Sequence, residues 1–563
     1  MRTRKTLYRT TPMIYNCELD MCPQCKGTLV EVAYLNGLKT VQTMTKVLTM
    51  AYRPKRCTAP TCNSSGMNWP SAAWQQIAPK YGTYGYDVIA QIGWTRQKRG
   101  QRFAAIHSEV AARIQISEAQ VRYLYHHRYL PLLACHERQH WQELTALSQQ
   151  SGLLLGLDGL MPEGGEPQLW VVRELHTGWT LRSGWMSCQD EAAFIEFLQP
   201  IADSGLLVKA LISDKQRGLL PAVTAVFPQA LHGFCQLHYL NNAAAPVAAA
   251  DEQMKIDLRQ KIRATVGDLI RHKQAETPVG LTVTGMIPTP VVPAIPALDL
   301  PAIATRERET IVQDILHRVR YLLSLKGRPP FRLAGIEMFA RLQEVSGCVQ
   351  ELLQQQTEPR LLTLQDGLQQ ALNAVRPEQS ELCQAARWLA DLAAVLDPDQ
   401  QPARTATQIR EEWQTCLAQI QEQGQASPRL QEFSSKIGKV SASYAPGLFH
   451  TYDVPGLPRT NNGRESEFRD LRRRLLSTTG QVGAVKRLLS RIGAWELIPG
   501  PNSLPETVAA IAHVARDQFL PELQRIQTHL ARFRLHTRSA KQAETQLKQL
   551  AQRWQALPLI NDS

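Results

Sequence analysis

Two aspartates stand where buried strands are expected to end. The apolar run 153–157 leads directly into Asp158, and the run 210–213 leads into Asp214. A carboxylate in such a place is costly unless a metal ion or a hydrogen bond compensates. Two strand-end carboxylates in one sheet can converge on hard cations that assist attack at a phosphodiester. The pair predicts metal-dependent phosphoryl chemistry, although a lone strand-end aspartate more often forms a turn or caps a helix.

A cysteine cluster near the N-terminus has the spacing of a metal site. Two close pairs can hold one ion tetrahedrally, in a closed site with no open coordination position. The pattern predicts a structural zinc ribbon, with DNA binding as a further hypothesis. Cys17 lies just upstream and could replace one ligand, and scattered buried thiols are the alternative. The predicted zinc ligands are Cys22, Cys25, Cys57 and Cys62.

Strand and helix patterns alternate around the two aspartates. Interleaving of this kind is typical of an α/β or mixed-sheet layer. Apolar runs and alternating patterns predict a strand, a strand pair, a helix, a strand, a helix and a strand, at 153–157, 169–185, 191–201, 207–213, 219–226 and 231–234.

After residue 242 the strand patterns stop. Helical spacing over 305–423 predicts a large all-helical insertion. Residues 278–301 hold six prolines and the single charge of Asp299, which predicts an extended loop or linker. Two or three amphipathic helices follow residue 499.

The helices between the cysteine cluster and the first aspartate are rich in cations. Residues 86–99, 103–113 and 117–129 read as three consecutive helices, with Ser117 as an N-cap and Glu118 in the first turn. A helix pair followed by a basic, aromatic helix suits insertion in a DNA major groove. A three-helix bundle with a solvated basic face is the alternative. The predicted DNA contacts are Arg96, Lys98, Arg99, Arg122 and Arg128.

Bulk composition agrees with a DNA-binding protein. The 63 Lys and Arg exceed the 50 Asp and Glu, and the net charge of +13 favours a polyanionic partner. No apolar run is long enough to span a membrane, and residues 1–16 lack the apolar core of a signal peptide. Most cysteines beyond the cluster lie singly, as expected of reduced thiols in a cytosolic or nuclear protein.

These motifs together resemble a known family. Asp158, Asp214, the Cys235-Gln-Leu-His238 segment, a long helical insertion and Thr460-Asn-Asn-Gly-Arg-Glu465 occur in the order of the DDE transposases with an RNase H-like core. The resemblance is closest to the Mutator-like group and related bacterial insertion-sequence transposases, and covers roughly residues 153–497. It implies hydrolysis at transposon ends, followed by attack of the freed 3′-hydroxyl on target DNA.

The third carboxylate has two candidates, Glu465 and Glu467. On a helix they point about 200° apart, so only one can face the aspartates. Glu465 fits the Asn-x-x-Glu spacing from Asn462 and is our choice. It shares its helix face with cations that could hold phosphates beside the metals, and a solvated basic helix is the alternative. The predicted DNA contacts on this helix are Arg469, Arg472 and Arg473.

Cys235 and His238 have the spacing of half a zinc site, with no second pair nearby. The resemblance implies that they, like Asn462, lie near the active site. A packed thiol and a hydrogen-bonded histidine are equally compatible with the pattern.

The predicted fold is multidomain, α/β plus α. We expect an RNase H-like mixed sheet interrupted by a large all-helical insertion and preceded by a zinc ribbon and a helix-turn-helix. The expected domains are 1–70 (zinc ribbon), 71–145 (helix-turn-helix), 146–245 (first part of the core), 246–450 (insertion), 451–500 (last core helix) and 501–563 (C-terminal helices).

The predicted function is that of a DNA transposase. Asp158, Asp214 and Glu465 would hold two Mg²⁺ or Mn²⁺ ions, and Zn²⁺ would be structural. The expected partners are transposon-end and target duplexes and further copies of the chain, in a bacterial cytoplasm at the nucleoid or in a eukaryotic nucleus. A non-catalytic DNA-binding protein derived from such an element, and a metal-dependent nuclease without strand transfer, are the alternatives.

Overall fold

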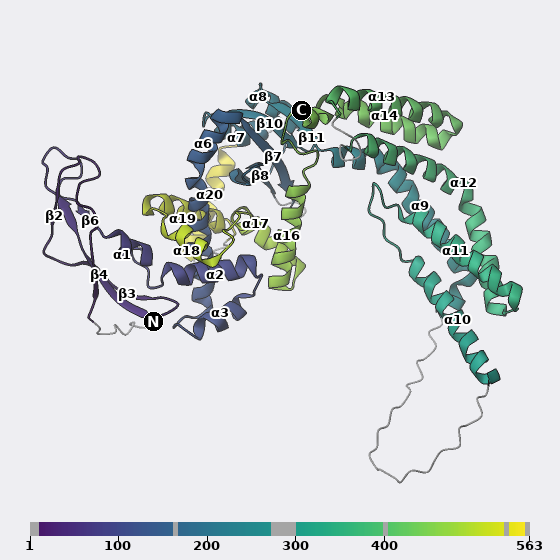
Figure 1. Cartoon of the computed structure of the whole chain (residues 1–563), viewed down its shortest axis with the longest axis horizontal. Helices are drawn as coiled ribbons and strands as arrows, with labels where there is room; N and C mark the ends of the chain where they lie inside the picture. The colour runs from purple at the N-terminus through teal and green to yellow at the C-terminus, as the bar shows by residue number, and fades with distance from the viewer. Residues whose placement is uncertain (1–10, 162–166, 272–299, 398–403, 534–539, 558–563) are drawn as a thin grey trace, which may run out of the picture. The chain divides into compact units, whose positions relative to one another are not determined.

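The computed structural model describes residues 11–161, 167–271, 300–397, 404–533 and 540–557. The chain forms two compact units, each described below by itself (Figure 1). The first comprises Met1–His232 and Asn461–Ser563, and the second comprises Gly233–Thr460.

The first unit begins with two small three-stranded sheets. One has the order β1-β4-β3 and the other β2-β5-β6. A short helix, α1 (Ala72–Ile77), follows and is capped by Ser71. The strands are β1 (Met13–Asn16), β2 (Leu29–Glu31), β3 (Asn36–Gln42), β4 (Val47–Arg53), β5 (Lys55–Cys57) and β6 (Asn68–Trp69).

The helices predicted next along the chain are present. The Ser117 side chain accepts a hydrogen bond of 3.2 Å from the backbone N–H of Gln120, which confirms the predicted N-cap. The third helix does not end at residue 129, because a π-helical turn at Tyr125–Tyr129 carries it into the next helix. The helices are α2 (Tyr86–Lys98), α3 (Phe103–Ala111), α4 (Glu118–Leu124), α5 (Leu130–Gln139) and α6 (Trp141–Ser151).

A five-stranded mixed sheet occupies the middle of the first unit, in the order β11-β10-β7-β8-β9. The strand β7 lies at the centre, parallel to β10 and antiparallel to β8. The elements predicted from residue 153 onward are all found, as β7 (Leu153–Leu160), β8 (Gln168–Glu174), β9 (Thr180–Met186), α7 (Glu191–Ala202), β10 (Val208–Ser213), α8 (Leu219–Val226) and β11 (Leu231–Phe234).

The predicted end of β7 is wrong. Asp158 does not follow the strand but lies within it, since Asp158, Gly159 and Leu160 continue to pair with β8. Strong pairing with a full-length antiparallel neighbour extends the strand past its apolar run.

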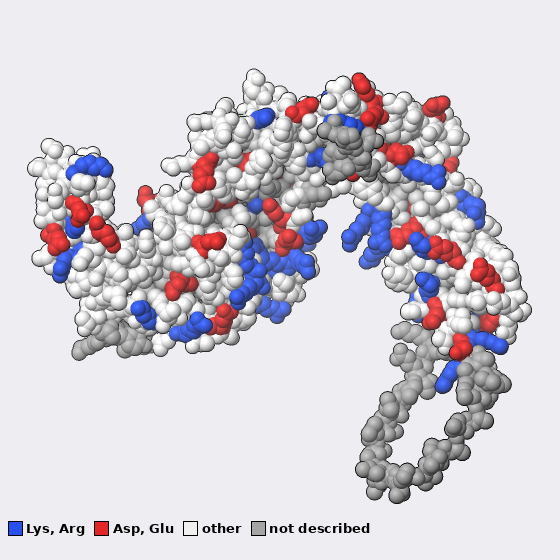
Figure 2. All heavy atoms as spheres, viewed as in Figure 1, with Lys and Arg blue, Asp and Glu red and all other residues white. Residues whose placement is uncertain are grey.

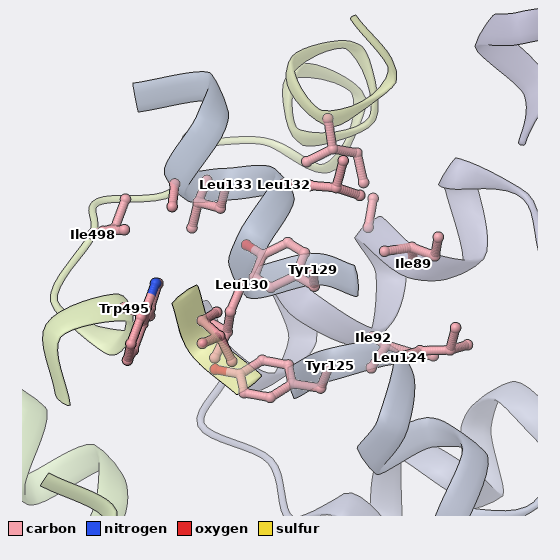
Figure 3. Close-up of a cluster of buried hydrophobic side chains, with 14 of the residues drawn as sticks. Ile89, Ile92, Leu124, Tyr125, Tyr129, Leu130, Leu132, Leu133, Trp495 and Ile498 are labelled. Atoms are coloured by element: carbon pink, nitrogen blue, oxygen red, sulfur yellow. The ribbon is translucent and has the colours of Figure 1, made fainter. Parts of the chain in front are cut away.

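The sheet separates two hydrophobic cores. One face packs Leu155, Leu157 and Trp170 against α7 and α8. The other face packs Leu160, Leu169 and Val171 against helices from both ends of the chain. Figure 3 shows Tyr125 and Tyr129 in this second core, with Ile89 and Ile92 of α2 and with Trp495. The helices α2 to α5 therefore share one core with the helices near the C-terminus.

Those later helices complete the first unit. They are α16 (Asn462–Thr479), α17 (Val482–Glu496), α18 (Leu504–Ala512), α19 (Arg516–Ala531) and α20 (Ala540–Gln555). Phe468, Leu471 and Leu475 form the buried side of α16.

The second unit consists of helices after the end of β11, as the insertion pattern predicts. Its longest helices, α9 and α12, pack along one another. The buried carboxylate of Asp251 accepts hydrogen bonds of 2.8 Å from the N–H groups of Gly335 and Ile336 and so fixes the start of α11. The helices are α9 (Gln236–Arg271), α10 (Leu300–Leu322), α11 (Ala334–Gln355), α12 (Pro359–Val395), α13 (Ala406–Gln423), α14 (Pro428–Leu448) and α15 (His450–Asp453).

Of the predicted proline-rich loop 278–301, residues 278–299 lie outside the described residues. The last two residues, 300 and 301, begin α10. None of the described helices combines the length and the apolar character that crossing a membrane requires.

Candidate active site and metal cluster

The two aspartates belong to neighbouring strand segments of the central sheet, Asp158 within β7 and Asp214 directly after β10. In the parallel pair, Ile212 of β10 is the partner of Gly156 of β7. Continuing this register by two residues sets Asp214, which follows β10, beside Asp158. Adjacent strands are about 4.8 Å apart, so two carboxylates at matching positions can act on one group of ligands.

Asp158 is held firmly by its surroundings. It is 7% exposed, and its Oδ1 accepts a hydrogen bond of 2.8 Å from the N–H of Gly159. A Cβ atom at Gly159 would come within 2.8 Å of the Trp170 ring, so only glycine fits beside this carboxylate. At the end of β10, the buried Ser213 hydroxyl lies 2.7 Å from Nε2 of His232 and donates to the backbone oxygen of Asp214. The backbone at both aspartates therefore has a defined position.

Asn461 fastens the start of α16 to β7. Its side chain is 2% exposed, and Nδ2 donates a hydrogen bond of 2.9 Å to the backbone oxygen of Leu157, next to Asp158. Sequence reasoning singled out Asn462 of the Asn-Asn pair for its spacing to Glu465 and missed Asn461. The signal available was an amide residue directly before a helix that must meet the sheet.

Glu467, the alternative third carboxylate, pairs with an arginine of the sheet. Arg173 of β8 is 3% exposed and donates through Nη1 to Glu467 at 2.7 Å, and through Nη2 to the backbone oxygen of Leu497. The side chains of Asn462 and Glu465 lie outside the described residues, although both positions belong to the first turns of α16.

The outer side of α16 is basic. Arg469, Arg472 and Arg473 are exposed, and Arg472 also donates to the backbone oxygen of Met161 at 3.1 Å. Figure 2 shows Lys and Arg side chains gathered over this helix. A pocket of about 740 Å³ beside it is lined by both cations and acids. The cations are Lys98, Arg99, Arg173, Arg473 and Arg474, and the acids are Glu467, Asp470 and Glu496.

Arg474 joins the pocket to the core. It donates to the backbone oxygen of Gln97 at 3.2 Å and to Oε2 of the buried Glu496 at 3.0 Å. Burial, together with the positive charge of Arg474, lowers the pKa of Lys98. The sequence predicts Arg474 only as one of three consecutive arginines lying along DNA, and its contact with Glu496 was not predicted.

Arg96 corrects one sequence expectation. The sequence predicts a DNA contact, but the side chain is 5% exposed, donates to the backbone oxygen of Gln101 at 2.8 Å and stacks over Phe103 at 4.4 Å. When a helix with several cations is packed against neighbours on more than one side, some of these side chains are buried. Arg96 is a core residue of this fold.

The other cations of the predicted helix-turn-helix lie at or near the surface. Lys98 and Arg99 are exposed, and so is Arg122, which pairs with Glu118 at 2.5 Å. Arg128 is partly buried, with its guanidinium 5.9 Å from the ring centre of Tyr123 and 5.4 Å from that of Phe519. Four of the five predicted cations therefore keep some access to solvent.

The four predicted zinc ligands come together in one cluster. One sulfur from each of Cys22, Cys25, Cys57 and Cys62 lies within 4.8 Å of the others. The Cys22–Cys62 and Cys25–Cys57 sulfur pairs are 3.8 Å and 3.7 Å apart. A tetrahedron with Zn–S bonds of about 2.3 Å has sulfur–sulfur edges of about 3.8 Å. This set could therefore hold a zinc ion.

Local hydrogen bonds shape the cluster. The N–H of Lys26 donates to the Cys22 oxygen at 2.9 Å, with Lys26 at a φ of 58°, which closes the turn between the first two ligands. The backbone N–H of Cys25 lowers the pKa of Cys22 to about 7, which favours its thiolate. Cys17 is buried elsewhere, hydrogen-bonded through its N–H to Arg53, and is not part of the cluster.

The remaining predicted neighbours belong to the second unit. Cys235 directly follows β11 and is buried, and His238 lies in the first turn of α9. In the same unit, the next residue, Gln236, donates through its N–H to the oxygen of Arg459 at 2.9 Å.

The chain is therefore a mixed α/β protein with Asp158 in the central strand of a sheet, Asp214 directly after the parallel neighbouring strand, a helix with exposed cations and a four-cysteine cluster. Residues 183–273 match the family described as Transposase, Mutator family. The matched segment contains Asp214, Cys235 and His238, and it confirms the resemblance inferred from the motifs and supports a transposase function. None of the curated protein sequences compared with the chain matches it.

Proposed function

We propose that the chain is a DNA transposase whose active site is formed by Asp158, Asp214 and Glu465. The observation that carries the proposal is the register of β7 and β10, which, continued by two residues, sets Asp214 beside Asp158. Carboxylate oxygens are the ligands that Mg²⁺ and Mn²⁺ prefer, so the donor set suits these ions. Two such ions would activate the attacking oxygen and stabilise the leaving oxygen.

The sheet order supports an RNase H-like core. Its first strand, β7, is central, with an antiparallel hairpin on one side and parallel β10 reached through a helix on the other. In such layers the first crossover brings the ends of two parallel strands together.

Helical periodicity supports Glu465 as the third ligand. Position 465 follows Asn461 by four residues and precedes Arg472 by seven, so the three share one side of α16. Asn461 and Arg472 both bind the backbone of the β7 segment, at Leu157 and Met161. Glu467 is instead engaged with Arg173.

DNA binding is proposed for the exposed cations of α16 and for the helices preceding the sheet. Arg469, Arg472 and Arg473 would contact phosphates near the carboxylates, while Lys98 and Arg99 extend the same basic surface. The helices α2 to α4 would act as a helix-turn-helix, and the cysteine cluster as a structural zinc ribbon. Joining two ends requires two DNA sites, so we propose a homo-oligomer on DNA.

An end-joining reaction tests the proposal. Duplexes cut from the DNA on either side of the coding sequence are incubated with the full chain, a supercoiled plasmid and Mg²⁺ or Mn²⁺. We expect joined products that disappear in Asp214→Asn. Asp203→Asn is the matched control, because Asp203 is an exposed aspartate at the end of α7 that is not part of the proposed site.

The other outcomes separate the alternatives. Cleavage without joining would overturn strand transfer and favour a metal-dependent nuclease. Specific binding to the flanking duplexes without cleavage in either metal would favour a non-catalytic DNA-binding protein.

A further inference from the structure

The end of α10 and the loop between α10 and α11 form a basic stretch without acids that the motifs did not account for. Residues 317–332 contain no Asp or Glu, and they hold His317 and five cations. These are Arg318, Arg320, Lys326, Arg328 and Arg332.

The loop has a defined shape. Buried Leu323 and Leu333 anchor its two ends in the helical core. Between them, the N–H of Arg328 donates to the oxygen of Arg332 at 2.7 Å, and the N–H of Arg332 returns to the oxygen of Arg328 at 3.1 Å. Arg332 also donates through Nε to Glu337 of α11 at 3.0 Å. The tip is therefore a closed hairpin that holds a fixed surface outward.

The hairpin exposes cations and an aromatic ring together. Lys326 and Arg328 are exposed, and within the described parts of the chain neither makes an ion pair. Phe331 at the tip is 59% exposed, and Tyr321 at the end of α10 is 66% exposed. Figure 2 shows Lys and Arg gathered over this loop of the second unit. Basic side chains beside exposed rings are the usual composition of surfaces that bind nucleic-acid backbones and stack on bases.

We propose that this hairpin is a second DNA-binding surface, carried by the helical insertion. Lys326 and Arg328 neutralise phosphates of a duplex, and Phe331 stacks on a base that is unpaired at a DNA end. This inference rests on the proposed function, because the DNA end that the hairpin would bind is produced by the proposed reaction.

Salt dependence of binding tests the role of the two cations. The full chain is titrated with a blunt mixed-sequence duplex without divalent metal, over a series of salt concentrations. Removing one cation that neutralises a phosphate lowers the slope of log K against log salt by about 0.9. We expect the double variant Lys326→Gln/Arg328→Gln to lower the slope by about 1.8. Both side chains are exposed, so the variant should fold normally.

A control removes equal charge from the same unit. Lys436 and Lys439 are exposed on α14, and Lys436→Gln/Lys439→Gln should leave the slope unchanged. An equal fall in both double variants would overturn the proposal, because net charge alone would then explain it. An unchanged slope in the hairpin variant of a chain that binds duplex would overturn it too, while leaving the proposed function standing. No duplex binding by the unmodified chain would instead overturn the proposed function.

Phe331 is tested separately with a duplex that carries a short unpaired 3′ tail. We expect Phe331→Ser to weaken binding of the tailed duplex at least about fivefold, the lower end of one base–aromatic stack, and to leave blunt duplex unaffected. Equal affinity of the variant and the unmodified chain for the tailed duplex would overturn the stacking role.

Discussion

Two neighbouring N-terminal regions, the strands at residues 13–69 and the helices α2 to α5, are stabilised in different ways. The strands at residues 13–69 have only small cores, one around Val41, Met50 and Trp74 and one that consists largely of the cysteines themselves. The helices α2 to α5 contribute to a large core shared with α16 to α19 and the central sheet. The first region should depend on metal and the second on the proposed catalytic fold. Adjacency in the chain therefore says little about which parts unfold together.

The largest expected effect of one substitution on global stability is in the shared core. Tyr125 is 0% exposed, stacks on Tyr129 and donates from its hydroxyl to Glu496 at 2.8 Å. We expect Tyr125→Ala to lower the free energy of unfolding by about 3–5 kcal/mol, measured by urea denaturation. Tyr123→Ala, at a side chain 42% exposed, is the control and should cost under about 0.5 kcal/mol. A loss below about 1 kcal/mol at Tyr125 would contradict its packing in the shared core and its contact with Glu496.

Loss of a zinc ligand should act on the other region alone. We expect Cys62→Ser to abolish zinc binding, measured by metal analysis, and to open residues 13–69 to proteolysis, because so small a core cannot persist without the ion. The urea transition of the shared core should stay unchanged. Cys188→Ser, at an exposed cysteine outside the cluster, should keep the metal. Unfolding of the shared core together with the cluster would contradict independence.

Acid should weaken the shared core through His126. Burial, with positive charge from His127, Arg96 and Arg122, lowers the pKa of His126 from 6.5 to about 4. The unfolded chain therefore takes up the proton first, so stability is full above pH 6.5 and falls as the pH drops towards 4. The free energy of unfolding is measured by urea denaturation at several pH values. We expect the fall in this free energy between pH 6.5 and pH 4 to be about 1–3 kcal/mol smaller in His126→Gln than in the unmodified chain. His176→Gln, at an exposed histidine, is the control and should keep the full pH dependence. If the pH profile of His126→Gln ran parallel to that of the unmodified chain, His126 would not be the cause of the pH dependence.

The smallest expected change in stability is at the joint between α16 and the sheet. Asn461→Asp keeps the shape of the side chain but removes the Nδ2 donor to Leu157. We expect a loss of about 1–2 kcal/mol in unfolding free energy, with a larger proportional fall in DNA cleavage because α16 would shift relative to Asp158. Asn373→Asp, at an exposed side chain of α12, should change neither quantity. Full cleavage by Asn461→Asp would show that the joint does not position the site.

Local patterns predicted the parts of this fold that depend on local chemistry. The cysteine spacing identified all four sulfurs of the cluster, and Ser117 identified the start of α4. The strands and helices from residue 153 to 234 followed from their apolar periodicity. The end of β7 could not be predicted from this periodicity, because pairing with β8, and not composition, extends the strand past Asp158.

Long-range packing could not be read from the chain. The inward turn of Arg96 depends on the packing of α2 within the shared core, and the roles of Asn461, Arg173 and Arg474 depend on partners far away in sequence. The residue type alone does not distinguish an arginine that is buried in a contact between distant segments from an arginine that faces DNA.

Metal-specific rescue tests the central claim most directly. If Asp214 holds a catalytic ion, Asp214→Cys should not cleave flanking duplex with Mg²⁺, because a thiolate is a poor ligand for that hard ion, and should recover cleavage with the softer Mn²⁺. Asp203→Cys should cleave with either ion. Cleavage by Asp214→Cys with Mg²⁺ at the rate of the unmodified chain would contradict the account.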